Sequence, residues 1–119
     1  MLNLDTKIVK NFVIRIFFAN FAGKITIKML KFISFGSGSS GNSYYLYTET
    51  DSLLIDVGVG IRTLKKHFHN YGLRFEDVHH ILITHDHADH VKSVGSLSTD
   101  YHLPVYTTRK VHAGIERNY

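Results

Sequence analysis

One six-residue stretch, His85-Asp86-His87-Ala88-Asp89-His90, constrains the fold of this chain more than any other feature. It follows the run Ile81-Leu82-Ile83-Thr84, which predicts a buried strand. Three imidazoles and two carboxylates on one turn form a ligand set that suits zinc, iron or manganese in open hydrolytic sites. The stretch therefore predicts a strand that ends in a metal site. The alternative is a histidine-rich surface tract that binds metal only adventitiously.

The spacing within the stretch can divide the ligands between two ions. Residues i and i+2 of an extended segment point the same way, so His85 and His87 can hold one ion. Asp89 and His90 lie on the continuing turn and can reach a second ion, which in two-metal sites is about 3.5–4 Å from the first. Asp56 ends an earlier predicted strand and can orient a ligand, although an aspartate there is commonly only a cap or turn residue.

Composition limits the remaining possibilities. The 119 residues make about one small domain. Because the chain has no cysteine, it has neither disulfides nor thiolate ligands, which fits a reducing compartment, and we expect the cytoplasm. The net charge of +4 arises in residues 1–28, which hold five basic side chains and one acidic one, whereas the rest of the chain is balanced. The charge is therefore no argument that the predicted domain binds nucleic acid.

Residues 1–28 differ in character from the rest of the chain. They contain an apolar, aromatic run over residues 8–22 that Lys10 and Arg15 interrupt. This run is too short and too charged for a membrane-spanning helix, which needs about 20 apolar residues, so we expect no stable membrane association. The open interpretations are a signal-like or interfacial helix, an ordinary strand or helix, and an upstream addition before a natural start at Met29. We expect the last of these and place the domain at 29–119.

From Met29 onward the pattern is that of short strands followed by alternating helices and strands. The expected strands cover 30–35, 43–47, 52–56, 81–84 and 104–107. The expected helices cover 61–71, 91–101 and a last segment capped by Thr108. The first strands follow one another without a helix, which predicts an antiparallel start. The class is therefore α/β.

A glycine- and serine-rich loop, residues 36–42, separates the first two predicted strands. It lacks the lysine of a phosphate-binding P-loop and no helix follows it, so that motif is rejected. Such a loop is most often a flexible hairpin connection. The alternative is a loop that faces the substrate, with Ser39, Ser40 and Asn42 as candidate substrate-binding residues.

These residues resemble the metallo-β-lactamase fold superfamily, on the evidence of Asp56 and the stretch 85–90. Residues 35–43, 54–58 and 83–90 carry a narrower likeness to its YycJ/VicX-like branch, and the resemblance covers 29–119. It implies an αββα sandwich of which this chain is the N-terminal half. It also implies a two-ion site in which His85 and His87 ligate one ion and Asp89 and His90 the other. Asp56 and Thr84 would support these ligands.

The resemblance also implies an activity. Members of this branch are described as phosphodiesterases or nucleases, notably DNA exonucleases, so the implied substrate is nucleic acid. Two divalent ions (zinc, or manganese or iron) would stabilise the charge that develops during phosphodiester hydrolysis, and Asp89 could also orient the attacking group as a catalytic residue. A thioester or lactam hydrolase of the same superfamily is the alternative enzyme. A non-catalytic metal-binding fragment is the alternative from another class.

The sequence departs from the family pattern after His90. Family sites need a further histidine, a bridging aspartate and a last histidine from later in the chain. Only His102, His112 and Asp100 follow the motif here, and they lie too close behind it to match those elements. We therefore expect a partial site and an inactive fragment of a larger enzyme. The oligomeric state stays open.

Overall fold

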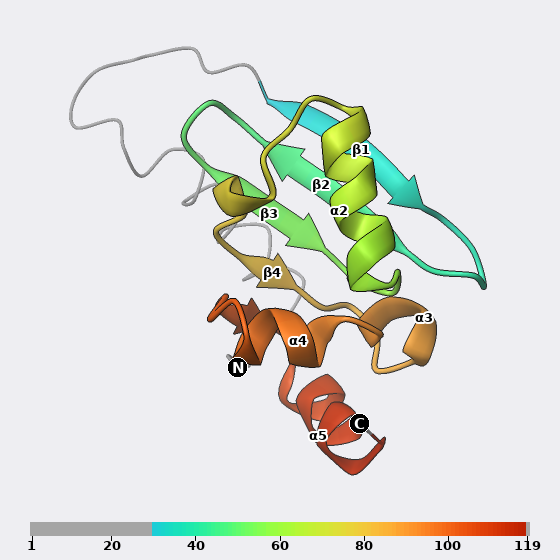
Figure 1. Cartoon of the computed structure of the whole chain (residues 1–119). Helices are drawn as coiled ribbons and strands as arrows, with labels where there is room; N and C mark the ends of the chain where they lie inside the picture. Colours follow the sequence, from blue (N-terminus) through green and yellow to red (C-terminus); the bar gives the residue numbers. More distant parts are fainter. Residues whose placement is uncertain (1–29, 119) are drawn as a thin grey trace, which may run out of the picture.

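The computed structural model describes residues 30–118, so our interpretation of residues 1–28 lies outside the described part of the chain. The elements in chain order are β1 (Lys31–Gly36), β2 (Ser43–Tyr47), β3 (Ser52–Ile55), α2 (Ile61–Asn70), η1 (Phe75–Asp77), β4 (Ile81–Leu82), α3 (Ala88–Val91), α4 (Val94–Thr99), β5 (Val105–Tyr106) and α5 (Arg109–Asn118) (Figure 1). The sheet order is β1-β2-β3-β4-β5. Pairing is antiparallel from β1 to β3 and parallel from β3 to β5. The α/β class with an antiparallel start is confirmed.

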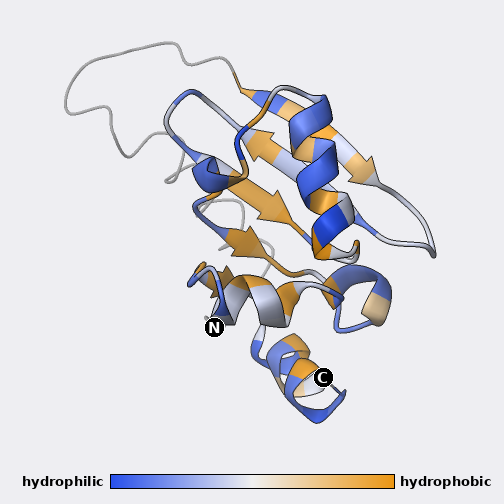
Figure 2. Cartoon of the chain, in the orientation of Figure 1, coloured by the Kyte–Doolittle hydropathy of each residue, from blue (hydrophilic) through white to orange (hydrophobic). Residues whose placement is uncertain are grey.

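Helix α2 covers one face of the sheet through an aromatic contact. Its buried residues Leu64 and Phe68 are four positions apart and therefore share one side of the helix. The Phe68 ring lies 5.0 Å from that of Phe35 on β1 and 4.7 Å from that of Tyr45 on β2. Figure 2 shows the outward side of this helix as hydrophilic. Burial of this stripe holds the helix on the sheet, as its apolar spacing predicts.

The opposite face of the sheet is apolar as well. Strand alternation places Phe32, Tyr44, Leu46 and Ile55 on the side away from α2. Phe32 is 59% exposed, and its ring stacks on that of Tyr44 at 5.9 Å. A sheet that is apolar on both faces is typical of folds in which both faces are covered.

Several expected elements have different bounds in the structure, and the helix after the motif differs most. The helix expected over 91–101 is two short helices, α3 and α4, and that prediction is wrong. Ser93 causes the break, because its N–H donates to the Val57 carbonyl at 2.9 Å and its hydroxyl to the Val59 carbonyl. The strand expected over 81–84 ends at Leu82, although Ile83 N–H still donates to the Tyr106 carbonyl.

No helix within residues 30–118 has the length and apolar character to cross a bilayer.

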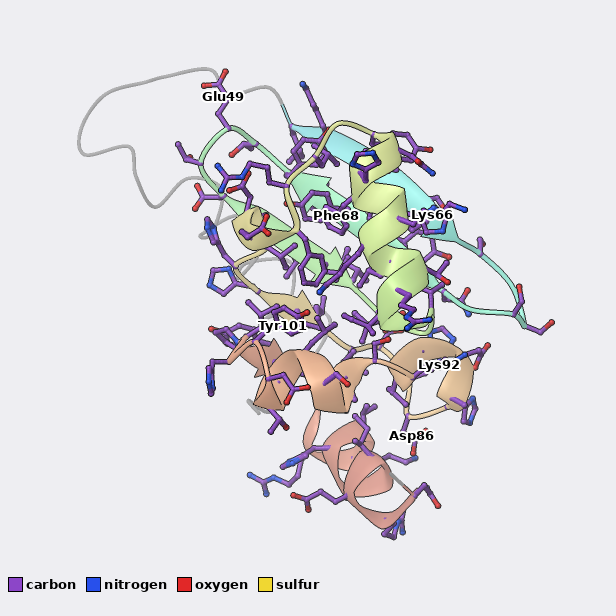
Figure 3. The ribbon with its side chains drawn as sticks, viewed as in Figure 1. Glu49, Lys66, Phe68, Asp86, Lys92 and Tyr101 are labelled. Carbon is purple, nitrogen blue, oxygen red and sulfur yellow. The ribbon has the colours of Figure 1, made fainter. Side chains whose placement is uncertain are left out.

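We expect Phe68→Ala to lower the free energy of unfolding by about 3–5 kcal/mol, because it removes a fully buried ring from the contact between α2 and the sheet. Lys66→Ala on the same helix is the control. Lys66 is exposed and points away from Phe68 in Figure 3, so its loss should change stability by less than about 0.5 kcal/mol. Urea unfolding measures both. Equal losses would contradict this packing.

Candidate metal centre

The candidate ligands gather where two parallel strands end. Asp56 directly follows β3, and the stretch 85–90 follows β4, which pairs with β3 in parallel. Carboxyl ends of parallel strands are where α/β folds commonly bind ligands. Ligand atoms of Asp56, His85 and His90 all lie within 4.8 Å of one another. The sheet therefore brings together groups that are about thirty positions apart in the sequence.

The carboxylate of Asp56 is the centre of this group. Its side chain is 3% exposed, and its backbone has a φ of 59°, which costs a non-glycine residue about 1 kcal/mol. Oδ1 accepts the Thr84 N–H at 2.8 Å, while Oδ2 accepts the Thr84 hydroxyl at 2.6 Å and lies 2.9 Å from His90 Nδ1. Both oxygens are thus engaged by protein donors. Asp56 is therefore better suited to orienting a ligand than to binding an ion itself.

The same hydrogen bonds select the tautomers of two histidines. A carboxylate only accepts, so the neutral form of His90 carries its proton on Nδ1 and has its lone pair on Nε2. Thr84 gives its one hydroxyl proton to Asp56, so its oxygen must accept from His85 Nδ1, 2.8 Å away. His85 therefore also keeps its lone pair on Nε2. Neutral imidazoles held in this way are the form that binds metal.

The other motif residues, Asp86, His87 and Asp89, differ in how closely they approach His85 and His90. The rings of His85 and His90 are 4.5 Å apart, whereas those of His85 and His87 are 6.3 Å apart. Asp89 Oδ2 lies 3.8 Å from His90 Nε2, and the His87 side chain is 75% exposed at the rim. The carboxylate of Asp86 approaches α5 so closely that a Cβ added at Gly114 would lie 1.7 Å from its Oδ2 (Figure 3). The nitrogen and oxygen donors of this stretch are of the types that bind zinc, iron or manganese.

Three backbone segments meet beside these ligands without intervening side chains. A Cβ added at Gly58 would lie 1.7 Å from the Asp89 carbonyl oxygen, and one added at Gly41 would lie 2.8 Å from the Gly58 carbonyl oxygen. The Asn42 N–H donates to the Asp89 carbonyl at 2.7 Å, and the Gly58 N–H donates to the Asn42 carbonyl at 2.9 Å. The loop 36–42, the turn after β3 and the metal motif are thereby fixed to one another.

The predicted substrate-binding residues separate into two kinds. Ser39 and Ser40 are exposed on the loop, as a residue that faces a substrate must be. Asn42 is only 8% exposed, and its amide nitrogen lies 3.2 Å from Asp89 Oδ2. Sequence reasoning missed this contact, and it also missed the buried bond from the Ser43 hydroxyl to the Asp56 carbonyl at 2.7 Å. A substrate role for Ser39, Ser40 and Asn42 stays a prediction.

Other histidines of the described chain have contacts outside the ligand group. His80 Nδ1 lies 3.4 Å from the Ser52 carbonyl oxygen, and burial lowers the pKa of this imidazole. Its position before β4 puts it at the opposite end of the strand from the metal motif. His112 pairs with Glu116 at 3.0 Å within α5. These contacts agree with structural or surface roles.

Thr84→Val removes the hydroxyl and keeps the branched shape. We expect it to lower the affinity for a divalent ion by about 10- to 100-fold, because His85 loses the partner that selects its tautomer. Thr84→Ser keeps the hydroxyl and should bind nearly as the unaltered chain does. Calorimetric titration with zinc measures this. A Val variant with unchanged affinity would contradict the assigned role.

Gly58→Ala should destabilise the protein by about 2–3 kcal/mol and weaken metal binding, because the new methyl group would overlap the backbone of Asp89. Gly60→Ala is the matched control. A Cβ at Gly60 meets nothing within 4 Å, and its φ of −60° suits alanine. Thermal unfolding and zinc titration of both variants test this expectation, and equal behaviour of the pair would refute it.

The chain is similar to several known proteins. The family described as "Anti-Pycsar protein Apyc1" matches residues 30–114. The chain is 39% identical over 87 residues to exodeoxyribonuclease YycJ of Bacillus anthracis, a match covering 73% of this chain and 33% of that relative. It is 36% identical over 88 residues to exodeoxyribonuclease WalJ of Streptococcus pneumoniae, with 74% and 33% covered. The chain thus spans about a third of the length of these curated relatives.

A solved structure gives the fold. The metallo-β-lactamase fold protein YhfI of Bacillus subtilis aligns with a TM-score of 0.56 and 22% identity, over 76% of this chain and 42% of that one. The expected superfamily fold and the narrower YycJ likeness are confirmed. The chain belongs to the family of the anti-Pycsar protein Apyc1 and is a YycJ-like protein of the metallo-β-lactamase fold.

Proposed function

We propose that this chain supplies the N-terminal half of a metal-dependent phosphodiesterase of the nuclease type, with nucleic acid as its substrate. The observation that carries the proposal is the chain of hydrogen bonds from Asp56 through Thr84, which engages the Nδ1 atoms of His85 and His90 and leaves their Nε2 atoms to bind metal. The two rings lie 4.5 Å apart. Relatives named exodeoxyribonucleases support the choice of a phosphodiester over a thioester or a lactam.

In this proposal His85 and His87 hold one divalent ion, and Asp89 and His90 hold the second. Zinc is the first candidate, with manganese or iron as alternatives. Bound divalent ions would lower the pKa of water and stabilise the charge that develops on phosphate oxygens. Asp89 is one-third exposed, so its carboxylate can also orient the attacking water toward phosphorus. Ser39 and Ser40 extend the exposed loop beside this position and are the candidates to contact the substrate.

The domain assignment is part of the proposal. Residues 29–119 would form half of an αββα sandwich, and residues 1–28 would stand outside it. The apolar sheet face with Phe32, Tyr44, Leu46 and Ile55 supports a second layer there. The family match over 30–114 and the coverage of a third of each relative are consistent with this division. A cytoplasmic location agrees with the absence of cysteine from the chain.

We expect His85→Ala and Asp89→Ala to weaken binding of zinc or manganese, whereas His67→Ala and His112→Ala leave it unchanged. Calorimetric titration of the 119-residue chain measures this. The matched controls remove histidines that contact Phe35 or Glu116 instead of the motif. Equal effects of all four substitutions would refute the ligand assignment.

The same preparation tests catalysis. With four candidate ligands of a two-ion site, the isolated chain should hydrolyse a phosphodiester probe such as bis(p-nitrophenyl) phosphate only slowly, whatever metal is added. Robust metal-dependent turnover that His87→Ala abolishes would overturn the expected inactivity while supporting the enzyme class. If the chain binds metal without turnover, the chain alone would be a non-catalytic metal-binding fragment.

A further inference from the structure

We propose that Asn42 is a positioning residue for the carboxylate of Asp89, through which the loop 36–42 controls the second half of the metal site. The inference rests on the proposed metal function of Asp89. It differs from the sequence prediction, in which Asn42 belonged to a group that faces the substrate. The structure places the side chain of Asn42 beneath that loop, 8% exposed, between Gly38 and the metal motif.

The orientation of the Asn42 amide is determined by its partners. Oδ1 accepts the Gly38 N–H at 3.0 Å, and Nδ2 donates to the Gly38 carbonyl at 2.8 Å. Nδ2 also lies 3.1 Å from the Asp89 carbonyl oxygen. Exchanging the amide oxygen and nitrogen would set an acceptor against two carbonyls and a donor against an N–H. The amide therefore presents a proton to Asp89, and this direction follows from the network itself.

The second Nδ2 proton of Asn42 is shared between the backbone carbonyl and the carboxylate of Asp89. Nδ2 lies 3.2 Å from Oδ2 of the carboxylate and 3.5 Å from His90 Nε2. Donation to Oδ2 orients the carboxylate and leaves Oδ1 to face an ion. Since the Asn42 backbone N–H also donates to the Asp89 carbonyl at 2.7 Å, one residue holds both the main chain and the side chain of this ligand.

This arrangement couples the loop to the ligand. The Asn42 side chain closes the turn that begins at Gly38, and the exposed Ser39 and Ser40 lie on that turn. A shift of the turn therefore moves the amide that orients Asp89. Asn42 contributes to metal affinity through the geometry of Asp89, without being a ligand.

Asn42→Ala tests the proposal, with cobalt(II) as the probe because its visible absorption reports the ligand set. We expect about tenfold or greater loss of cobalt(II) affinity and an altered spectrum. Ser52→Ala is the matched control. The buried Ser52 hydroxyl donates to the Asp77 carbonyl and accepts the His79 N–H, at the other end of the strands. This variant should lower the urea midpoint and keep the cobalt(II) affinity.

A double-mutant cycle separates positioning from general support. If Asn42 acts through Asp89, Asn42→Ala has no further effect on cobalt(II) affinity in an Asp89→Ala background. An effect that persists in full there, an Asn42→Ala variant that binds as the unaltered chain does, or an equal loss in Ser52→Ala would overturn the proposal. Asn42→Ser replaces Asn42→Ala if far-UV circular dichroism shows that the alanine variant is unfolded. Failure of the unaltered chain to bind cobalt(II) would overturn the metal function itself, and the inference with it.

Discussion

A buried carboxylate with three donors organises the metal end of this protein. Asp56 leaves β3 with a positive φ, and its oxygens accept both the backbone and the hydroxyl protons of Thr84 while facing His90 Nδ1. An unpartnered carboxylate at this depth would be costly, so the surrounding donors must be in place whenever the domain is folded. The ends of β3 and β4 and the start of α3 are therefore joined at a single group. Ligand orientation and folding depend on the same contacts.

Close backbone packing supplies the second constraint. Gly41 and Gly58 let the loop 36–42 and the turn after β3 lie directly against the main chain of Asp89. Hydrogen bonds from Asn42 to Asp89 and from Val57 to the His90 carbonyl then bind these segments together. A glycine-rich loop is often mobile, but here its last residue is buried and bonded to the motif. Ser39 and Ser40 are thus exposed on a loop whose last residue is held against the metal motif.

Much of this fold could be predicted from the sequence because local patterns decide it. The spacing of Leu64 and Phe68 predicts α2. Thr108 precedes α5 and caps it as expected, because its hydroxyl accepts the Val111 N–H at 3.2 Å. The prediction of one helix after the motif was wrong because Ser93 bonds to carbonyls that follow β3, thirty-four positions away in the case of Val59. Apolar spacing carries no information about such a bond, since it depends on which segments become neighbours.

The candidate site shows the same difference between what local sequence patterns predict and what contacts between distant segments decide. The sequence by itself determined the ligand types, their order in the motif 85–90 and their place after a buried strand, because these follow from residue identity and short-range spacing. Only the tertiary structure decided which atoms meet. It turned the Nδ1 atoms of His85 and His90 to Thr84 and Asp56, directed Asp86 toward α5 and placed the Asn42 amide against Asp89. Such contacts join segments far apart in the chain, and their geometry exists only once the parallel strands have paired.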